Sequence, residues 1–211
     1  MPTKKKDEPS ALEQVERFVL KAVDRTDPVY VGVDPGATGA IAFLCGPLYL
    51  VVDIPTFSVA RKRVVKVRKR TPGGPKTKTV DGKTTVFDNA NTVRLFRALK
   101  PLKSRLYVAL EIAQPMVKGK KGNNPRTAYL VGIGYGMWPL FLLSKGYSLE
   151  ETQPNAWKKD MGLLRKDKNA SRKVAQAAFP AAPLSRTDDH NRAEALLLAK
   201  WLMQRRKAAD P

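Results

Sequence analysis

Apolar residues with a period of two predict three strands in the first quarter of the chain. Valines alternate over 29–33, a Gly-rich turn leads to the apolar run 41–44, and a second turn leads to 48–54. Residues at every second position line one face of a strand, and short connections favour pairing between neighbouring strands. The pattern therefore predicts an antiparallel meander of three strands.

Apolar residues three or four apart predict helices through much of the remaining chain. Helices are expected at 12–19, 88–99, 127–143, 155–160, 168–178 and about 189–205, and further strands at 106–110 and 148–153. This order is typical of an α/β protein in which helices cover both faces of one sheet.

A chain of 211 residues is long enough for one domain with a sizeable core. We expect that domain at 29–206, preceded by an arm and a short peripheral helix at 1–28 and followed by a tail at 207–211. The insertion 61–83 is rich in Arg, Lys, Thr, Pro and Gly. Because it can bury little apolar surface, it is expected to project as an arm or hairpin.

The charge of the chain indicates that the α/β domain has a polyanionic partner. Its 39 Lys and Arg and 19 Asp and Glu leave a net charge of +20. Such an excess repels itself unless a polyanion is near, which favours nucleic acid over an ordinary basic surface or a membrane surface. The single cysteine, Cys45, excludes a disulfide framework and a cysteine-based zinc site. Without an apolar leader or spanning segment, we expect a cytoplasmic protein with no membrane partner.

Two carboxylates stand where predicted strands end. Asp34 follows the strand at 29–33 and precedes a Gly-rich turn, and Glu111 ends the strand that begins at 106. Such positions hold a side chain rigidly and leave room for a substrate backbone. Taken alone, Asp34 also fits a structural turn acid or the phosphate loop of an actin-like ATPase, and Glu111 also fits an ordinary strand-end acid.

A third group of polar residues opens the last predicted helix. Asp188 and Asp189 can be explained by the helix dipole, whereas Glu194 lies beyond the first turn. His190 and Glu194 are one helical turn apart and face the same way. His190 fits a metal ligand or a general acid or base, and equally a hydrogen-bonding residue at the helix start.

If the last helix packs across the strand ends, its acids meet the two strand-end acids. The expected catalytic set is Asp34, Glu111, Asp189, His190 and Glu194. Hard oxygen ligands of this kind suit Mg²⁺ or Mn²⁺, and two ions roughly 3.5–4 Å apart activate water and stabilise a leaving oxygen. Unliganded carboxylates repel one another, so metal binding is expected to be coupled to deprotonation.

Two basic runs are expected to bind DNA phosphates, although each is also compatible with a solvated surface. Such contacts supply affinity that depends on salt but not on base sequence. The residues expected to bind DNA are Lys118, Lys120, Lys121 and Arg126 in the first run, and Lys158, Lys168, Arg172 and Lys173 in the second.

Five motifs occur in one order along the chain. They are GVDPG at 32–36 with TGA at 38–40, Glu111 followed by QP at 114–115, GIGYGMW at 132–138, QPNAWK at 153–158, and DHNRAEALL at 189–197. With these motifs, the chain from about residue 30 to residue 201 resembles the RuvC-like Holliday-junction resolvases, in particular the MOC1-type chloroplast resolvases and related bacterial and phage proteins.

This resemblance implies an RNase H-like fold, in which a mixed five-stranded sheet of three antiparallel strands and then parallel strands is flanked by helices. It also implies a homodimeric endodeoxyribonuclease of DNA recombination and repair. Such an enzyme cuts four-way DNA symmetrically and depends on Mg²⁺ or Mn²⁺, with two ions in each site. By position, the implied metal ligands are Asp34, Glu111, Asp189 and Glu194.

The chain departs from the resolvase pattern at one ligand. Bacterial resolvases carry two acids three residues apart, whereas Asn191 stands three residues before Glu194. Asp188, Asp189 or His190 would then supply the missing ligand, and the sequence leaves this open. No transit segment is visible, which favours a bacterial or phage cytoplasm over a chloroplast. The rival readings are a junction-binding protein without catalysis, and an actin-like ATPase, which needs a duplicated half.

Overall fold

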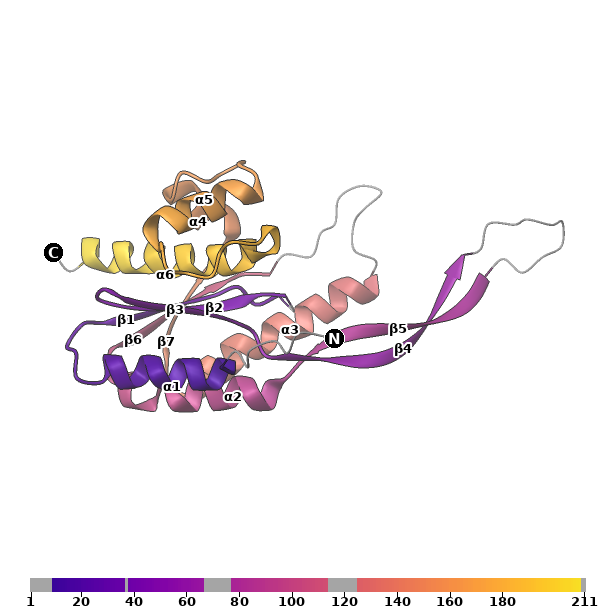
Figure 1. Cartoon of the computed structure of the whole chain (residues 1–211), viewed down its shortest axis with the longest axis horizontal. Helices are drawn as coiled ribbons and strands as arrows, with labels where there is room; N and C mark the ends of the chain where they lie inside the picture. The colour runs from indigo at the N-terminus through magenta and orange to yellow at the C-terminus, as the bar shows by residue number, and fades with distance from the viewer. Residues whose placement is uncertain (1–8, 37, 67–76, 114–124, 210–211) are drawn as a thin grey trace, which may run out of the picture.

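A mixed five-stranded sheet with the order β3-β2-β1-β6-β7 forms the centre of the molecule (Figure 1). The computed structural model describes residues 9–36, 38–66, 77–113 and 125–209. The strands of this sheet are β1 (Val29–Val33), β2 (Ala40–Cys45), β3 (Leu48–Asp53), β6 (Leu106–Glu111) and β7 (Ser148–Thr152). β1, β2 and β3 pair antiparallel, while β6 pairs parallel with β1 and with β7. The predicted meander and the predicted mixed sheet are both confirmed.

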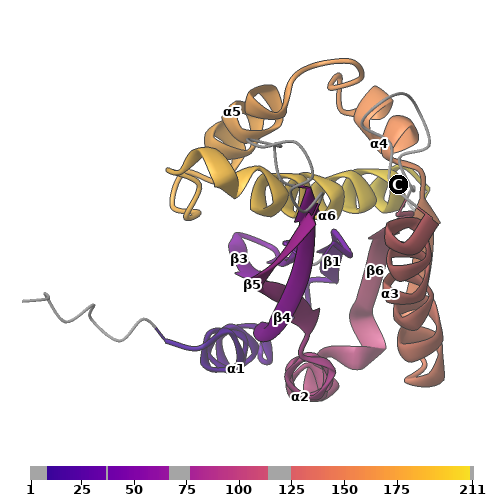
Figure 2. The same ribbon diagram turned by 90° about the vertical axis from the view of Figure 1, so that its right-hand side faces the viewer.

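Helices cover both faces of this sheet (Figures 1 and 2). One face carries α1 (Ala11–Ala22), α2 (Asn89–Ala98), the 3-10 helix η1 (Lys100–Arg105) and α3 (Pro125–Ser144). The other face carries α6 (His190–Ala209), with α4 (Pro154–Asp160), α5 (Lys168–Ala178) and the 3-10 turn η2 (Thr187–Asp189) around it. Across the residues that the structure describes, no helix has the length and apolar character needed to cross a membrane.

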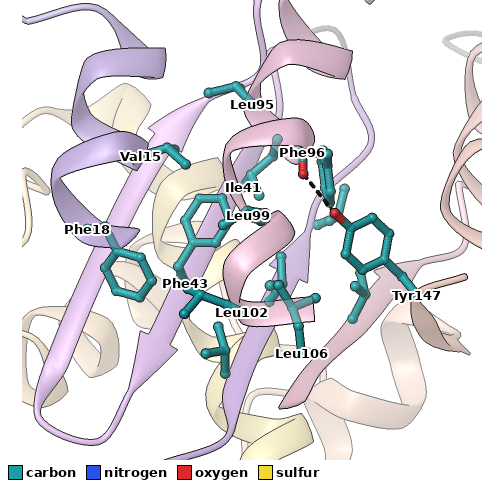
Figure 3. Packing of buried hydrophobic residues seen from close by; sticks show 14 of the residues in the cluster. Val15, Phe18, Ile41, Phe43, Leu95, Phe96, Leu99, Leu102, Leu106 and Tyr147 are labelled. Atoms are coloured by element: carbon teal, nitrogen blue, oxygen red, sulfur yellow. Dashed lines mark hydrogen bonds between the residues drawn. The ribbon is translucent and has the colours of Figure 1, made fainter. Parts of the chain in front are cut away.

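The face under α1, α2 and α3 is an apolar core. Val31 and Val33 of β1 point into it together with Val108 and Leu110 of β6, as the period of two requires. Figure 3 shows the aromatic and aliphatic side chains that fill it, and the hydroxyl of Tyr147 donates to the Phe96 carbonyl oxygen at 2.7 Å.

The short N-terminal helix differs from the expectation that it would be peripheral. In α1, Val15 and Ala22 are fully buried, and Phe18 packs against Phe43 of β2 with ring centroids 5.7 Å apart. A reciprocal pair of hydrogen bonds between Ser10 and Glu13 caps its start. The amphipathic spacing of the helix therefore reflects a place in the main core.

The opposite face of β1 brings α6 unusually close. A Cβ added to Gly32 would lie 2.6 Å from the Ala199 backbone nitrogen and would also collide with the Ala195 carbonyl oxygen. Only glycine fits between the strand and the helix at this point. α6 therefore lies directly on β1, and its first turns reach the carboxyl end of that strand.

A separate two-stranded sheet extends away from the body of the molecule (Figure 1). It consists of β4 (Thr56–Lys66) and β5 (Thr77–Phe87), paired antiparallel from Thr56 with Phe87 to Lys66 with Thr77. We call it the β4–β5 ribbon. It lies where the projecting arm was expected, at 61–83, and begins earlier in the chain. Residues 67–76 lie outside the described residues. At its base, Phe87 packs against Gly134 of α3.

Candidate active site

Asp34 and Glu111 come together because of the parallel pairing of their strands. Val33 of β1 is opposite Leu110 of β6, so the next residue of each strand lies at the same edge of the sheet. Both side chains alternate with residues of the apolar core and therefore face α6. The backbone amide of Gly36 donates to Asp34 Oδ1 at 3.2 Å, so the turn after β1 holds this carboxylate.

Glu111 is held by an indole from the next βα connection. β7 leads into α4, whose Pro154 occupies the first turn, and Trp157 of α4 is fully buried. Its Nε1 donates to Glu111 Oε2 at 2.6 Å. Trp157 belongs to the QPNAWK motif at 153–158, from which no role was predicted for it. The available signal was that a buried indole N–H needs an acceptor.

Glu194 reaches the same place from the second turn of α6. Lys158 Nζ donates to Glu194 Oε1 at 2.9 Å, and the hydroxyl of Ser171 lies 3.4 Å from the same oxygen. The carboxylate side chain is only 13% exposed. Lys158 was predicted to bind DNA phosphates, whereas the structure places its ammonium group on an acid. We call Asp34, Glu111 and Glu194 the acid cluster.

Burial and the negative charges of the acid cluster raise the pKa values of Asp34 and Glu111. Burial raises the pKa of Asp34, and the negative charge of Glu194 raises this pKa further, against the amide of Gly36 and the positive charges of Lys158 and His190. Burial also raises the pKa of Glu111 to about 7; the neighbouring acids add to this rise, while the Trp157 hydrogen bond and Lys158 oppose it. Burial and the neighbouring negative charges therefore favour the protonated forms of Asp34 and Glu111.

His190 and Asn191 lie at the rim of the acid cluster. The charge of His190 lowers the pKa of Asp34, which places the imidazole near that carboxylate, and its Nδ1 is 3.5 Å from the Thr187 carbonyl oxygen. Asn191 Nδ2 donates to the carbonyl oxygen of Thr38 at 2.6 Å and to its hydroxyl at 3.1 Å. These bonds tie the start of α6 to the turn that follows Asp34.

Asp189, a predicted metal ligand, is turned toward arginines instead. Its carboxylate accepts from the Arg186 backbone amide at 2.8 Å and from Arg186 Nη2 at 2.8 Å, and Arg192 Nη1 lies 3.9 Å away. Burial would raise the pKa of Asp189, but the Arg186 hydrogen bonds and charge hold it below its usual value. Asp189 therefore closes the η2 turn and pairs with arginines, outside the acid cluster, and its role as a metal ligand stays a prediction.

The acid cluster has the chemistry of a divalent-cation site. Among the described side chains, no three acidic, histidine or cysteine residues already stand close enough together to hold a metal ion. Lys158 supplies the only cation that donates to Glu194 within this described part. The three carboxylates supply the hard oxygen donors that Mg²⁺ and Mn²⁺ prefer. The donor set therefore fits the predicted metal once Lys158 releases Glu194.

The predicted DNA-binding residues are only partly visible. Lys118, Lys120 and Lys121 lie outside the described residues, as do the side chains of Arg126 and Lys168. Lys173 on α5 is exposed, and Arg172 is half-buried. Within the described part, the Arg172 Nε atom is buried and makes no hydrogen bond.

Comparison with known proteins gives a partial match to a resolvase. Over 85 residues, which are 39% of this chain and 10% of the relative, the chain is 35% identical to the chloroplastic Holliday junction resolvase MOC1 of Chlamydomonas reinhardtii. The chain is similar to a Holliday junction resolvase. The MOC1-type resemblance that the motifs indicated is thereby supported. The chain covers much less than two thirds of this relative.

Comparison with solved structures and with family models gives weaker results than the match to MOC1. A solved structure of RuvC from Thermus thermophilus covers 84% of this chain and 96% of its own, at 16% identity and a TM-score of 0.42. No family model matches the chain. The relative is a chloroplast protein by name, and the bacterial or phage cytoplasm predicted from the sequence stays a prediction.

Proposed function

We propose that this protein is a divalent-metal-dependent endonuclease that resolves four-way DNA. The observation that carries the proposal is the acid cluster, which three distant parts of the chain bring to one edge of the sheet. The net charge of +20 supplies the attraction to a polyanionic substrate. The similarity to a resolvase points to branched DNA among polyanions.

Each residue of the site has a distinct task in this proposal. Asp34, Glu111 and Glu194 hold the metal, with His190 beside Asp34 as a further ligand or as the group that accepts a proton from water. When bound, two Mg²⁺ or Mn²⁺ ions lower the pKa of water and stabilise the charge on the leaving oxygen. Lys158 neutralises Glu194 in the metal-free protein and, once released, is placed to bind a phosphate oxygen.

Symmetric resolution needs two sites, and α3 offers a surface on which a second copy can pack. Its exposed apolar residues follow helical spacing, with Ile133 45%, Leu140 74% and Leu143 59% exposed. A Cβ added to Gly132 or Gly136 would meet no described atom, so a partner backbone can approach there. We propose that two copies pair through α3. Light scattering should then give a dimer, and Leu140→Asp should give a monomer.

The deciding experiment is incubation of the protein with a mobile four-way DNA and Mg²⁺ or Mn²⁺. The wild type should nick two opposing strands at symmetric positions, and Asp34→Asn should bind the junction without cutting it. Asp24→Asn, which changes an exposed acid outside the site, serves as the matched control and should cut like the wild type. Binding by the wild type without cleavage under every divalent ion would favour the rival, a junction-binding protein without catalysis.

A further inference from the structure

The part of the sequence that contains the two strands of the β4–β5 ribbon is strongly basic. The segment 61–83 holds ten of the chain's 39 Lys and Arg and a single acid, Asp81. Its described strands form a sheet of their own that reaches beyond the body of the molecule (Figures 1 and 2). A basic surface of this density favours a polyanionic partner.

The described part of the ribbon also has one uncovered apolar side. The register places Phe57 opposite Val86, and Val59 and Arg61 lie on the same face because side chains alternate along β4. Phe57 is 50%, Val59 41% and Val86 37% exposed. A two-stranded sheet is only marginally stable alone in water. Its shape and composition therefore fit a segment that is completed by a partner.

The base of the ribbon adjoins the proposed site. An open pocket is lined by Thr56 of β4 and Thr85 of β5 and by Thr38 and His190 beside them. Its lining also includes charged residues of both signs: Arg186, Arg192, Asp53, Asp188 and Asp189. His190 lies beside Asp34, so this pocket connects the rim of the acid cluster with the start of the ribbon.

We propose that the β4–β5 ribbon binds one duplex arm of the DNA substrate next to the cleavage site. The major groove of B-form DNA admits a two-stranded ribbon. Strands of 11 residues span roughly 36 Å at about 3.3 Å per residue, close to one turn of the double helix. Arg61 and Lys62 lie along this length and contact phosphates without reading base sequence. This inference rests on the proposed function because it takes DNA as the substrate.

The test measures binding alone, in EDTA, to a fluorescent linear DNA duplex of about 20 base pairs. Arg61→Glu/Lys62→Glu should weaken binding about tenfold or more at ~100 mM salt and reduce the slope of log K against log salt by about 2. Arg61→Gln/Lys62→Gln should show a smaller loss in the same direction. Arg17→Glu/Lys21→Glu makes the same charge change on α1, across the sheet from the acid cluster, and should have a much weaker effect. Equal melting temperatures show that all variants are folded.

Three results would overturn the ribbon's assignment: an unchanged salt slope, an equal loss in the α1 control, or an equal loss on an RNA duplex of the same length. The RNA arm is informative because the deep, narrow major groove of A-form RNA does not admit the ribbon. Binding in EDTA does not depend on cleavage. If the ribbon variants lose DNA binding and the wild type never cuts a junction, the proposed function is wrong and the ribbon's role in binding stands. If the ribbon variants bind and cut like the wild type, the ribbon's role is wrong and the proposed function stands.

Discussion

Two ion pairs at the start of α6 look alike and differ in what surrounds them. Asp189 pairs with Arg186 at 2.8 Å, and Glu194 pairs with Lys158 at 2.9 Å. Asp189 has a second arginine nearby and a pKa below its usual value, so its charge is satisfied. Glu194 instead adds negative charge to two buried acids whose pKa values are raised. The first pair stabilises the fold, while the second leaves a deficit of positive charge that a divalent cation can fill.

The largest effect expected from this difference is on cleavage. Asp34→Asn and Glu194→Gln should each slow single-turnover cutting of a four-way DNA by at least about a hundredfold, because each removes charge from the metal site. Asp189→Asn should stay within about tenfold of wild type, because its carboxylate faces Arg186. A loss in Asp189→Asn as deep as that in Glu194→Gln would erase the distinction between the two pairs.

For stability we expect the opposite order, with the larger effect in Asp189→Asn and the smaller in Glu194→Gln. Asp189→Asn should lower the free energy of unfolding by about 2 kcal/mol, because an amide replaces the buried carboxylate that accepts hydrogen bonds from the backbone and the side chain of Arg186. For a chain of this size that is a fall in melting temperature of roughly 4–8 °C. Glu194→Gln should melt at or above the wild-type temperature in EDTA. Thermal melting followed by circular dichroism at pH 7 checks both variants, and destabilisation by Glu194→Gln alone would contradict the comparison.

The positions of the strand-end acids could be predicted from the sequence, whereas the ligand that pairs with Glu194, Asp188, Asp189 or His190, could not. A carboxylate at the end of a buried strand is fixed in place by the strand register, and the pairing of β1 with β6 brings Asp34 and Glu111 to the same edge of the sheet. At a helix start, neighbouring acids point in directions 100° apart, and their partners come from elsewhere in the chain. The pairing of Asp189 with Arg186 depends on the η2 turn, which no hydrophobic pattern reveals.

The helices and strands could be predicted from the sequence, whereas contacts between distant elements could not. Periodicity gave nearly all elements of the sheet and its helices, including α5 at its observed bounds. It could not show that Lys158 lies on Glu194, because α4 and α6 are brought together only by tertiary packing. The ribbon was predicted from its composition, but its length and its position at the rim of the acid cluster come from the structure.

A smaller effect concerns pH and stability at Glu111. The folded-state pKa of Glu111, about 7, is above its ordinary value of 4.5, so the stability linked to its protonated form is complete below pH 4.5 and is lost as pH rises through about 7. Glu111→Gln keeps an acceptor for Trp157 and should raise the melting temperature in EDTA at pH 8 by about 2–4 °C, with little change at pH 4.5. An equal rise at both pH values would show that ionisation of Glu111 is not the cause.

The smallest effect is a shift in the pH profile of cleavage. Lys158 lowers the pKa of both Asp34 and Glu111, so its removal should raise both values. In Lys158→Met the acid limb of the profile should move to higher pH, with activity about 3- to 10-fold below wild type at pH 7 and partly recovered at pH 9. Lys159→Met, an exposed neighbour on α4, is the matched control. A uniform loss at every pH would assign Lys158 to phosphate binding alone.

Direct titration of Mn²⁺ into the DNA-free protein tests whether Asp34, Glu111 and Glu194 together bind a divalent cation. Calorimetry at pH 8 should show Mn²⁺ binding to the wild type and to Asp189→Asn. The same titration near pH 7 should also release protons. Binding should be lost in Asp34→Asn and strongly weakened in Glu194→Gln. Unchanged Mn²⁺ binding in Asp34→Asn, or its loss in Asp189→Asn alone, would contradict the account.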